Sequence, residues 1–170
     1  FTVNIALVES GTAIFGMVYV PVTDVLYYGV NKLGSWKEHR GEKIALKSRP
    51  ISFESDIKIV GSRRHGAEAL DLLLAKISSK FKSTELVSMG SSLKICALAE
   101  GSADWYPRLA LTSEWDTAAA HAVLSAAGGS IVDDQMNRLN YNQKESLLNP
   151  FFHAFGDTSF NWNSLIKAST

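Results

Sequence analysis

The sequence predicts an α/β protein of the α+β type, in which an antiparallel sheet is followed by a mixed, mainly parallel sheet flanked by helices. The chain has 170 residues and is 46% hydrophobic, which is enough for one ordinary core. Residues 1–9 alternate with a period of two, and residues 12–28 are rich in β-branched and aromatic side chains, a pattern typical of strands joined by short turns. After Pro50, short strand-like runs alternate with helical patterns. We therefore divide the chain into residues 1–49, residues 50–160 and a tail at 161–170.

The first part contains three kinds of segment. Residues 1–9 (FTVNIALVE) alternate apolar and polar side chains, predict a strand, and end at a serine–glycine turn. Residues 12–28 are rich in β-branched and aromatic side chains and predict one or two strands, interrupted at Pro21. Residues 29–49 are polar and predict an exposed hairpin and a linker. We expect the strands within residues 1–28 to form an antiparallel meander.

The second part alternates strands with helices. The strands are expected at 56–61, 86–89, 103–109, 130–133 and 151–155. The expected helices are residues 67–80, with leucines at helical spacing, a helix that opens at Gly90, and a helix that opens at Asp116. An Asn-Pro turn precedes the last strand, and residues 161–170 predict a helix or a loose tail.

The helix that opens at Asp116 is the most distinctive element. Asp116 is a preferred N-cap residue, six alanines follow it, and Gly128 or Gly129 can end the helix in a left-handed conformation. Small side chains on every side predict close packing against more than one neighbour. Trp115 is expected to anchor the turn before the helix. An aspartate in this position can act as a cap alone or as a ligand held on a rigid element.

Composition limits the compartment and the partners. Basic and acidic residues balance at 17 each, which argues against a nucleic-acid polymer as partner, leaves a peripheral membrane contact open, and does not fix an oligomeric state. Cys96 is the single cysteine, so a reducing compartment, the cytoplasm, is expected. No apolar run reaches membrane-spanning length. Because Phe1 opens directly on a strand without an initiator Met, we expect the chain to be the later part of a longer protein.

Polar loops follow several of the expected strands, at the sheet edge where α/β proteins bind ligands. The Gly90-Ser91-Ser92 run offers backbone N–H groups to an anion, and Lys94 can reach back to the same group. Alternatively, one of the serines only caps the helix and Lys94 is a solvated surface lysine.

Two further side chains are candidate phosphate contacts. His65 can bond a phosphate or lie near a base, or it can be an ordinary loop histidine. Arg108 stands at the end of a strand, where a guanidinium can bind phosphate with two parallel bonds, or it can form a surface ion pair. The sequence contains no P-loop, no Ser/His/Asp triad and no zinc-type spacing of cysteines and histidines.

The segment WDTAAAHAVLSAAGG resembles the C-terminal signature of the inositol monophosphatase superfamily, which are magnesium-dependent, lithium-sensitive phosphatases with a layered, sugar-phosphatase-like fold. Three more segments, VGSRRH, MGSSLKICALAEGSADWYPR and ESLLNPFFHAFGD, are similar to its CysQ-type 3′(2′),5′-bisphosphate nucleotidase branch. The resemblance covers roughly residues 1–156. It implies that residues 1–49 are the remnant of an N-terminal sheet domain and that 50–160 form the substrate-binding domain.

The resemblance also implies the reaction and its residues. The reaction would be magnesium-dependent hydrolysis of adenosine 3′,5′-bisphosphate to AMP and phosphate, which clears a by-product of sulfate assimilation. Asp116 would be the catalytic metal ligand for Mg²⁺. The residues implied to hold the small nucleotide bisphosphate are Ser62, His65, Gly90, Ser91, Lys94 and Arg108.

The sequence departs from the family in one respect. Members carry an acidic Glu pair and an Asp-Pro-x-Asp-Gly-Thr motif upstream of the strand that begins here, and neither is in these 170 residues. Magnesium prefers six oxygen ligands, so Asp116 alone does not make a metal site. We therefore expect this chain by itself to be inactive. The alternatives are a non-catalytic nucleotide-binding fragment and a phosphatase that acts on inositol phosphates.

Overall fold

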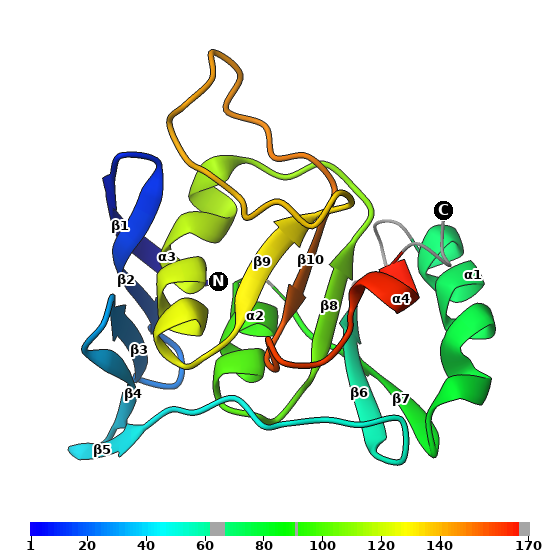
Figure 1. The fold of residues 1–170 in the computed structure, drawn as a ribbon. Helices are drawn as coiled ribbons and strands as arrows, with labels where there is room; N and C mark the ends of the chain where they lie inside the picture. Colours follow the sequence, from blue (N-terminus) through cyan, green and yellow to red (C-terminus); the bar gives the residue numbers. More distant parts are fainter. Residues whose placement is uncertain (62–66, 91, 167–170) are drawn as a thin grey trace.

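The computed structural model describes residues 1–61, 67–90 and 92–166. Its elements form successive layers (Figure 1): an antiparallel sheet, two helices, a second sheet, and two outer helices on the far side of that sheet. This arrangement confirms the predicted α+β class. None of the described helices has the length and apolar character needed to cross a membrane.

The first sheet is a five-stranded meander in which every neighbouring pair is antiparallel. Its strands are β1 (Val3–Glu9), β2 (Thr12–Val20), β3 (Val25–Val30), β4 (Gly34–His39) and β5 (Glu42–Ala45). The predicted hairpin within residues 29–49 is confirmed, and it extends the sheet as β4 and β5. Arg40 and Gly41 turn this hairpin with φ angles of 52° and 83°, the left-handed conformation that tight hairpin turns require.

The second sheet has the order β7-β6-β8-β10-β9. Its strands are β6 (Asp56–Gly61), β7 (Ser83–Ser88), β8 (Trp105–Arg108), β9 (Ser130–Asp133) and β10 (Phe152–Phe155). The sheet is mixed, as predicted, but β6 is parallel to β7 and β8 whereas β10 is antiparallel to β8 and β9. The expectation of a mainly parallel sheet is therefore met in only half of the pairs. The reason is that no crossover helix lies between β9 and β10, so a loop returns the chain antiparallel.

The helices differ from the prediction mainly where they begin. They are α1 (Ala67–Ile77), followed by a 3₁₀ turn at Ser78–Lys80, α2 (Leu93–Ala99), α3 (Glu114–Ala126) and α4 (Asn163–Ile166). The helix expected from Gly90 begins at Leu93, and the helix expected from Asp116 begins at Glu114. In the predicted tail, Trp162, Leu165 and Ile166 are buried in the core beneath the second sheet, so this part packs rather than hangs free. Residues 167–170 lie outside the described residues.

The α3 helix lies against the first sheet with backbone-to-backbone contact. A Cβ atom added to Gly16 would lie 2.0 Å from the carbonyl oxygen of Ala119, and one added to Gly29 would lie 2.6 Å from the Cα of Val123. The small residues of helix and sheet therefore match, as the alanine run predicts. Strand residues of the first sheet and residues of α2 and α3 belong to one hydrophobic cluster. The division proposed near residue 50 thus separates two sheets that share a core.

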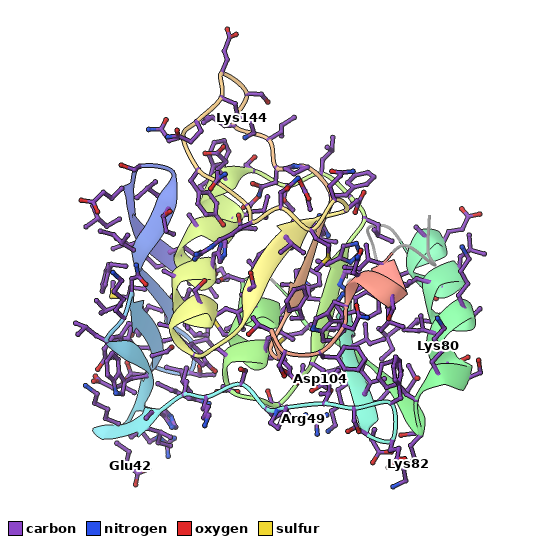
Figure 2. The ribbon with its side chains drawn as sticks, in the orientation of Figure 1. Glu42, Arg49, Lys80, Lys82, Asp104 and Lys144 are labelled. Atoms are coloured by element: carbon purple, nitrogen blue, oxygen red, sulfur yellow. The ribbon has the colours of Figure 1, made fainter. Side chains whose placement is uncertain are left out.

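The linker between the sheets is attached to the second sheet through an ion pair (Figure 2). The Nε and Nη2 atoms of Arg49 donate to the two carboxylate oxygens of Asp104 at 2.6 and 2.5 Å. Asp104 is only 2% exposed and also accepts the backbone N–H of Lys58 at 2.7 Å. Because both carboxylate oxygens are bonded, this buried charge is compensated.

Candidate active site

A cavity of about 470 Å³ lies at the beginning of α2 and α3. It brings together four of the predicted site residues, Gly90, Lys94, Arg108 and Asp116, from segments far apart in the sequence. The other described lining residues are Phe1, Thr2, Asn4, Met89, Ser92, Ile95, Tyr106, Thr112, Thr117 and Phe152. The remaining predicted contacts, Ser62, His65 and Ser91, lie outside the described residues.

Lys94 is a buried cation at this cavity. It is the second residue of α2, only 5% exposed, and its Nζ lies 5.2 Å from the centre of the Tyr106 ring. Among residues 1–61, 67–90 and 92–166, no acidic side chain forms an ion pair with it. Burial, and secondarily the charge of Arg108, lower the pKa of Lys94 to about 8. The alternative of a solvated surface lysine is wrong.

Arg108, the last residue of β8, places a second positive charge on the cavity wall. Its Nε donates to the carbonyl of Ala110 and its Nη2 to the carbonyl of Leu111, both at 3.1 Å. In the part of the chain that is described, it forms no ion pair, so the alternative of a surface ion pair is not met. These two bonds fix the loop that leads from β8 to α3.

Asp116 is the third residue of α3, not its N-cap. Ser113 is the N-cap residue, and its backbone N–H donates to Asp116 Oδ2 at 2.9 Å, as in a capping box. The sequence prediction placed the cap too late because both residue types suit that position. Asp116 is exposed, and it is the one carboxylate among the described residues that line the cavity.

The turn before α3 is anchored by Glu114 rather than by Trp115, which is 63% exposed. Glu114 is 6% exposed, accepts the backbone N–H of Asn142 at 2.6 Å, and pairs with Lys144. Lys144 belongs to the long loop between β9 and β10 (Figure 2). Burial alone would raise the pKa of Glu114, but the bonds from Lys144 and Asn142 outweigh it and lower that pKa.

The beginning of α2 also differs from the prediction. Ser92 is the N-cap residue, yet its hydroxyl makes no capping bond; it lies 3.0 Å from the Thr2 hydroxyl instead. The serine cap considered for this helix is therefore not formed by Ser92. Among the described residues, no heavy atom lies within 4 Å of a Cβ added to Gly90, and Gly90 lines the cavity.

Three residues that the sequence analysis did not single out belong to the site. Thr112 and Thr117 line the cavity on either side of Asp116, and the buried side chain of Asn149 contacts both threonines. The Asn-Pro pair gave only a turn signal, and the threonines had no chemical motif of their own.

The described residues supply only part of a metal site. Within the described ranges, no group of three or more His, Cys, Asp or Glu side chains could hold a metal ion. Asp116 fits a magnesium ion as a single oxygen ligand, with its other oxygen oriented by the Ser113 N–H. The donor set is thus too small to hold the ion by itself.

Comparisons with known proteins identify the family of the chain. The model of the inositol monophosphatase family matches residues 1–161. The chain is 42% identical over 152 residues to the 3′(2′),5′-bisphosphate nucleotidase CysQ of Salmonella typhimurium, covering 89% of this chain and 58% of that protein. It is 33% identical to the Haemophilus influenzae protein of the same name, covering 98% of this chain and 61% of the relative.

A solved structure gives the same likeness. The structure of CysQ from Bacteroides thetaiotaomicron, a bacterial member of the inositol monophosphatase family, superimposes with a TM-score of 0.77 at 37% identity, covering 91% of this chain and 62% of that one. The chain therefore spans about three fifths of the length of the relatives it matches.

Proposed function

Because this chain belongs to the inositol monophosphatase family, we propose that it carries the substrate-binding part of a 3′(2′),5′-bisphosphate nucleotidase. The proposed reaction is the hydrolysis of adenosine 3′,5′-bisphosphate by water to AMP and inorganic phosphate. The relatives named above, which are 3′(2′),5′-bisphosphate nucleotidases, support this choice of substrate. The proposal assigns the protein to sulfur metabolism, with a small nucleotide bisphosphate as its partner.

The observation that carries the proposal is the pair of cations at the cavity. Lys94 is buried without an acidic partner among the described residues, and Arg108 is the positive charge near it. A buried ammonium without a counter-charge is unfavourable, and a phosphate group would supply that charge. Charge-assisted hydrogen bonds from lysine and arginine to phosphate are among the stronger ones in proteins. The two side chains therefore suit a substrate that carries phosphate groups.

Asp116 suits the metal side of the same cavity. We propose that it is one ligand of Mg²⁺, although no group of three or more His, Cys, Asp or Glu side chains among the described residues could hold the ion. When bound, such an ion neutralises phosphate charge and lowers the pKa of a bound water. The part that this chain supplies is an oriented carboxylate, because the Ser113 N–H holds Asp116 Oδ2 at the first turn of a rigid helix.

Two further assignments stay predictions. Ser62, His65 and Ser91 are proposed as additional nucleotide contacts from their places in the resembling motifs. The cytoplasm is proposed as the compartment, because Cys96 is a free, buried thiol that suits reducing conditions.

The test is phosphate release by the full-length protein in the presence of Mg²⁺, with adenosine 3′,5′-bisphosphate and inositol monophosphate as rival substrates. We expect at least a tenfold preference in kcat/KM for the nucleotide. A preference for inositol monophosphate would overturn the substrate assignment, and no hydrolysis of either would overturn the proposed activity.

A further inference from the structure

Asn149 holds an unusual position for a loop residue. It lies in the long loop between β9 and β10, yet it is only 2% exposed. Its side-chain Nδ2 lies 2.8 Å from the carbonyl oxygen of Ser113, 3.0 Å from Thr117 Oγ1 and 3.1 Å from Thr112 Oγ1. One amide thus connects Thr112, the N-cap residue Ser113, and Thr117 in the first turn of α3.

The backbone around Asn149 makes the same connection. The Asn149 N–H donates to the carbonyl of Thr112 at 2.8 Å, and the Glu114 N–H donates to the carbonyl of Leu147 at 2.8 Å. Between these bonds, Ser113 and Leu148 form an antiparallel bridge. The loop therefore pairs, like a short strand, with the residues that lead into α3.

The amide can adopt only one orientation here. The carbonyl of Ser113 can only accept a hydrogen bond, so the NH₂ group of Asn149 must face it. The Oδ1 atom is then buried without a partner among the described residues. An apolar side chain would avoid the unpaired oxygen, but it would also remove the amide donor from the Ser113 carbonyl and the two threonine hydroxyls. The bonds made by the NH₂ group are therefore what favours an asparagine at this position.

What the amide fixes is the turn that carries Asp116. Ser113, whose carbonyl Asn149 binds, donates its N–H to Asp116 Oδ2 at 2.9 Å. Thr117, which Asn149 also binds, follows Asp116 directly and donates to the carbonyl of Glu114 at 3.2 Å. The carboxylate therefore stands between two residues that the same amide holds.

We propose that Asn149 is a positioning residue, which fixes the first turn of α3 and so aims the Asp116 carboxylate into the cavity. The part of this inference that concerns metal affinity rests on the proposed function, in which Asp116 is a magnesium ligand. The part that concerns the turn does not.

The first experiment measures backbone hydrogen exchange in the 170-residue chain. In Asn149→Ala, the Ser113 amide should exchange at least tenfold faster relative to the Ile59 amide in β6. Thr117→Val, which removes one acceptor of Asn149 and keeps the side-chain shape, is the milder variant and should act in the same direction. Ile57→Val, in the fully buried core beneath the second sheet, is the control for a general loss of stability and should not change the ratio.

The second experiment measures activity of the full-length protein against Mg²⁺ concentration. Asn149→Ala should raise the Mg²⁺ concentration for half-maximal activity at least fivefold, while KM for the nucleotide stays within twofold. Ile57→Val should change neither value. If Asn149 had only a general structural role, Asn149→Ala and Ile57→Val would change the Mg²⁺ concentration for half-maximal activity to the same extent.

The outcomes separate the two claims. Unchanged exchange at Ser113 in both variants, or faster exchange with an unchanged Mg²⁺ requirement, would overturn the positioning role. If the wild-type protein does not hydrolyse the nucleotide, the proposed function fails, and the exchange ratio alone then decides whether Asn149 holds the turn.

Discussion

Lys94 is a buried cation that has no acidic partner among the described residues. A negatively charged ligand would compensate its charge. Its ammonium lies over the Tyr106 ring, which attracts a cation but does not replace a counter-ion. A phosphate group at the cavity would accept hydrogen bonds from Lys94 and from Arg108. The proposed affinity for nucleotides therefore depends on two side chains of this chain.

Replacing either side chain should weaken nucleotide binding. Lys94→Ala or Arg108→Ala should cost about 1.5–3 kcal/mol of binding free energy, the range for a hydrogen bond to a charged group. Isothermal calorimetry with adenosine 3′,5′-bisphosphate measures this difference. Lys82→Ala removes a lysine whose side chain is 69% exposed, and it should leave the affinity unchanged. Equal affinities for all three variants and the wild type would remove both residues from the binding site.

The pH dependence of binding should follow the titration of Lys94. Burial lowers the pKa of Lys94 to about 8 in the free protein, and a bound phosphate favours the ammonium and raises that pKa again. The complex therefore keeps a proton that the free protein has lost, so affinity falls as pH rises above about 8. Nucleotide phosphates, with a second pKa of about 6, are already ionised in this range.

Calorimetry between pH 7 and pH 10 tests this sign. Affinity should be nearly constant below pH 8 and should fall by up to tenfold per unit above it. Lys94→Gln should bind more weakly and show a flat profile. A wild-type profile that is flat, or that rises with pH, would contradict the assignment of Lys94 as the titrating group.

At the scale of elements, the contact between α3 and the first sheet is set by two glycines. Gly16→Ala would place a methyl group 2.0 Å from the carbonyl oxygen of Ala119, and Gly29→Ala would place one 2.6 Å from the Cα of Val123. Backbone atoms cannot rotate away as side chains can, so helix and sheet must separate. Overpacking of this kind typically costs about 1–3 kcal/mol.

Denaturant unfolding measures the cost of these two substitutions. Both variants should lower the free energy of unfolding, with Gly16→Ala the more severe. Gly90→Ala is the matched control, because an added Cβ there meets no heavy atom of the described residues within 4 Å. If Gly16→Ala were as stable as Gly90→Ala, the close approach of α3 to β2 would be wrong.

Sequence patterns predicted which helices and strands exist better than they predicted where those elements end or how the strands pair. The alanine run and Gly128 located α3, and Gly128 ends it with a φ of 105°. The start was misplaced by two residues, because Ser113 and Asp116 both suit an N-cap and only the hydrogen bond between them decides the matter. The antiparallel direction of β10 depends on a loop without a helix, which the strand patterns do not reveal.

The sequence predicted which residues contribute to the candidate site, but not how deeply they are buried or which side chains surround them. Gly90, Lys94, Arg108 and Asp116 were candidates from their places near the ends of strands and helices and were assigned to the site from the family resemblance; the structure brings them to one cavity. The burial of Lys94 arises from residues distant in the sequence, so no local pattern shows it. The role of Asn149 likewise comes from partners more than 30 residues away.

At the scale of the whole molecule, the cavity is better equipped to bind phosphate groups than to hold a catalytic metal ion. Two cations face it, whereas Asp116 is the sole carboxylate among its described lining residues. Phosphoryl transfer depends mainly on positioning and on charge stabilisation by metal ions, with little covalent help from the protein. We therefore expect this chain to bind the nucleotide without hydrolysing it.

We expect the 170-residue chain to have little or no magnesium-dependent phosphatase activity, although we expect it to bind the nucleotide through Lys94 and Arg108. The reason is the number of metal ligands, because magnesium prefers six oxygens and the described residues that line the cavity supply one carboxylate. Phosphate release from adenosine 3′,5′-bisphosphate should be compared between this chain and a version extended upstream of Phe1. Calorimetry on both samples shows whether the nucleotide binds.

The two measurements together decide between the alternatives. Binding without turnover in the short chain, with turnover in the extended one, is the expected result. Comparable turnover in both would refute the prediction and would mean that other carboxylates of these 170 residues complete the metal site. Binding without turnover in both would instead favour a non-catalytic nucleotide-binding protein, because Lys94 and Arg108 would then serve recognition alone.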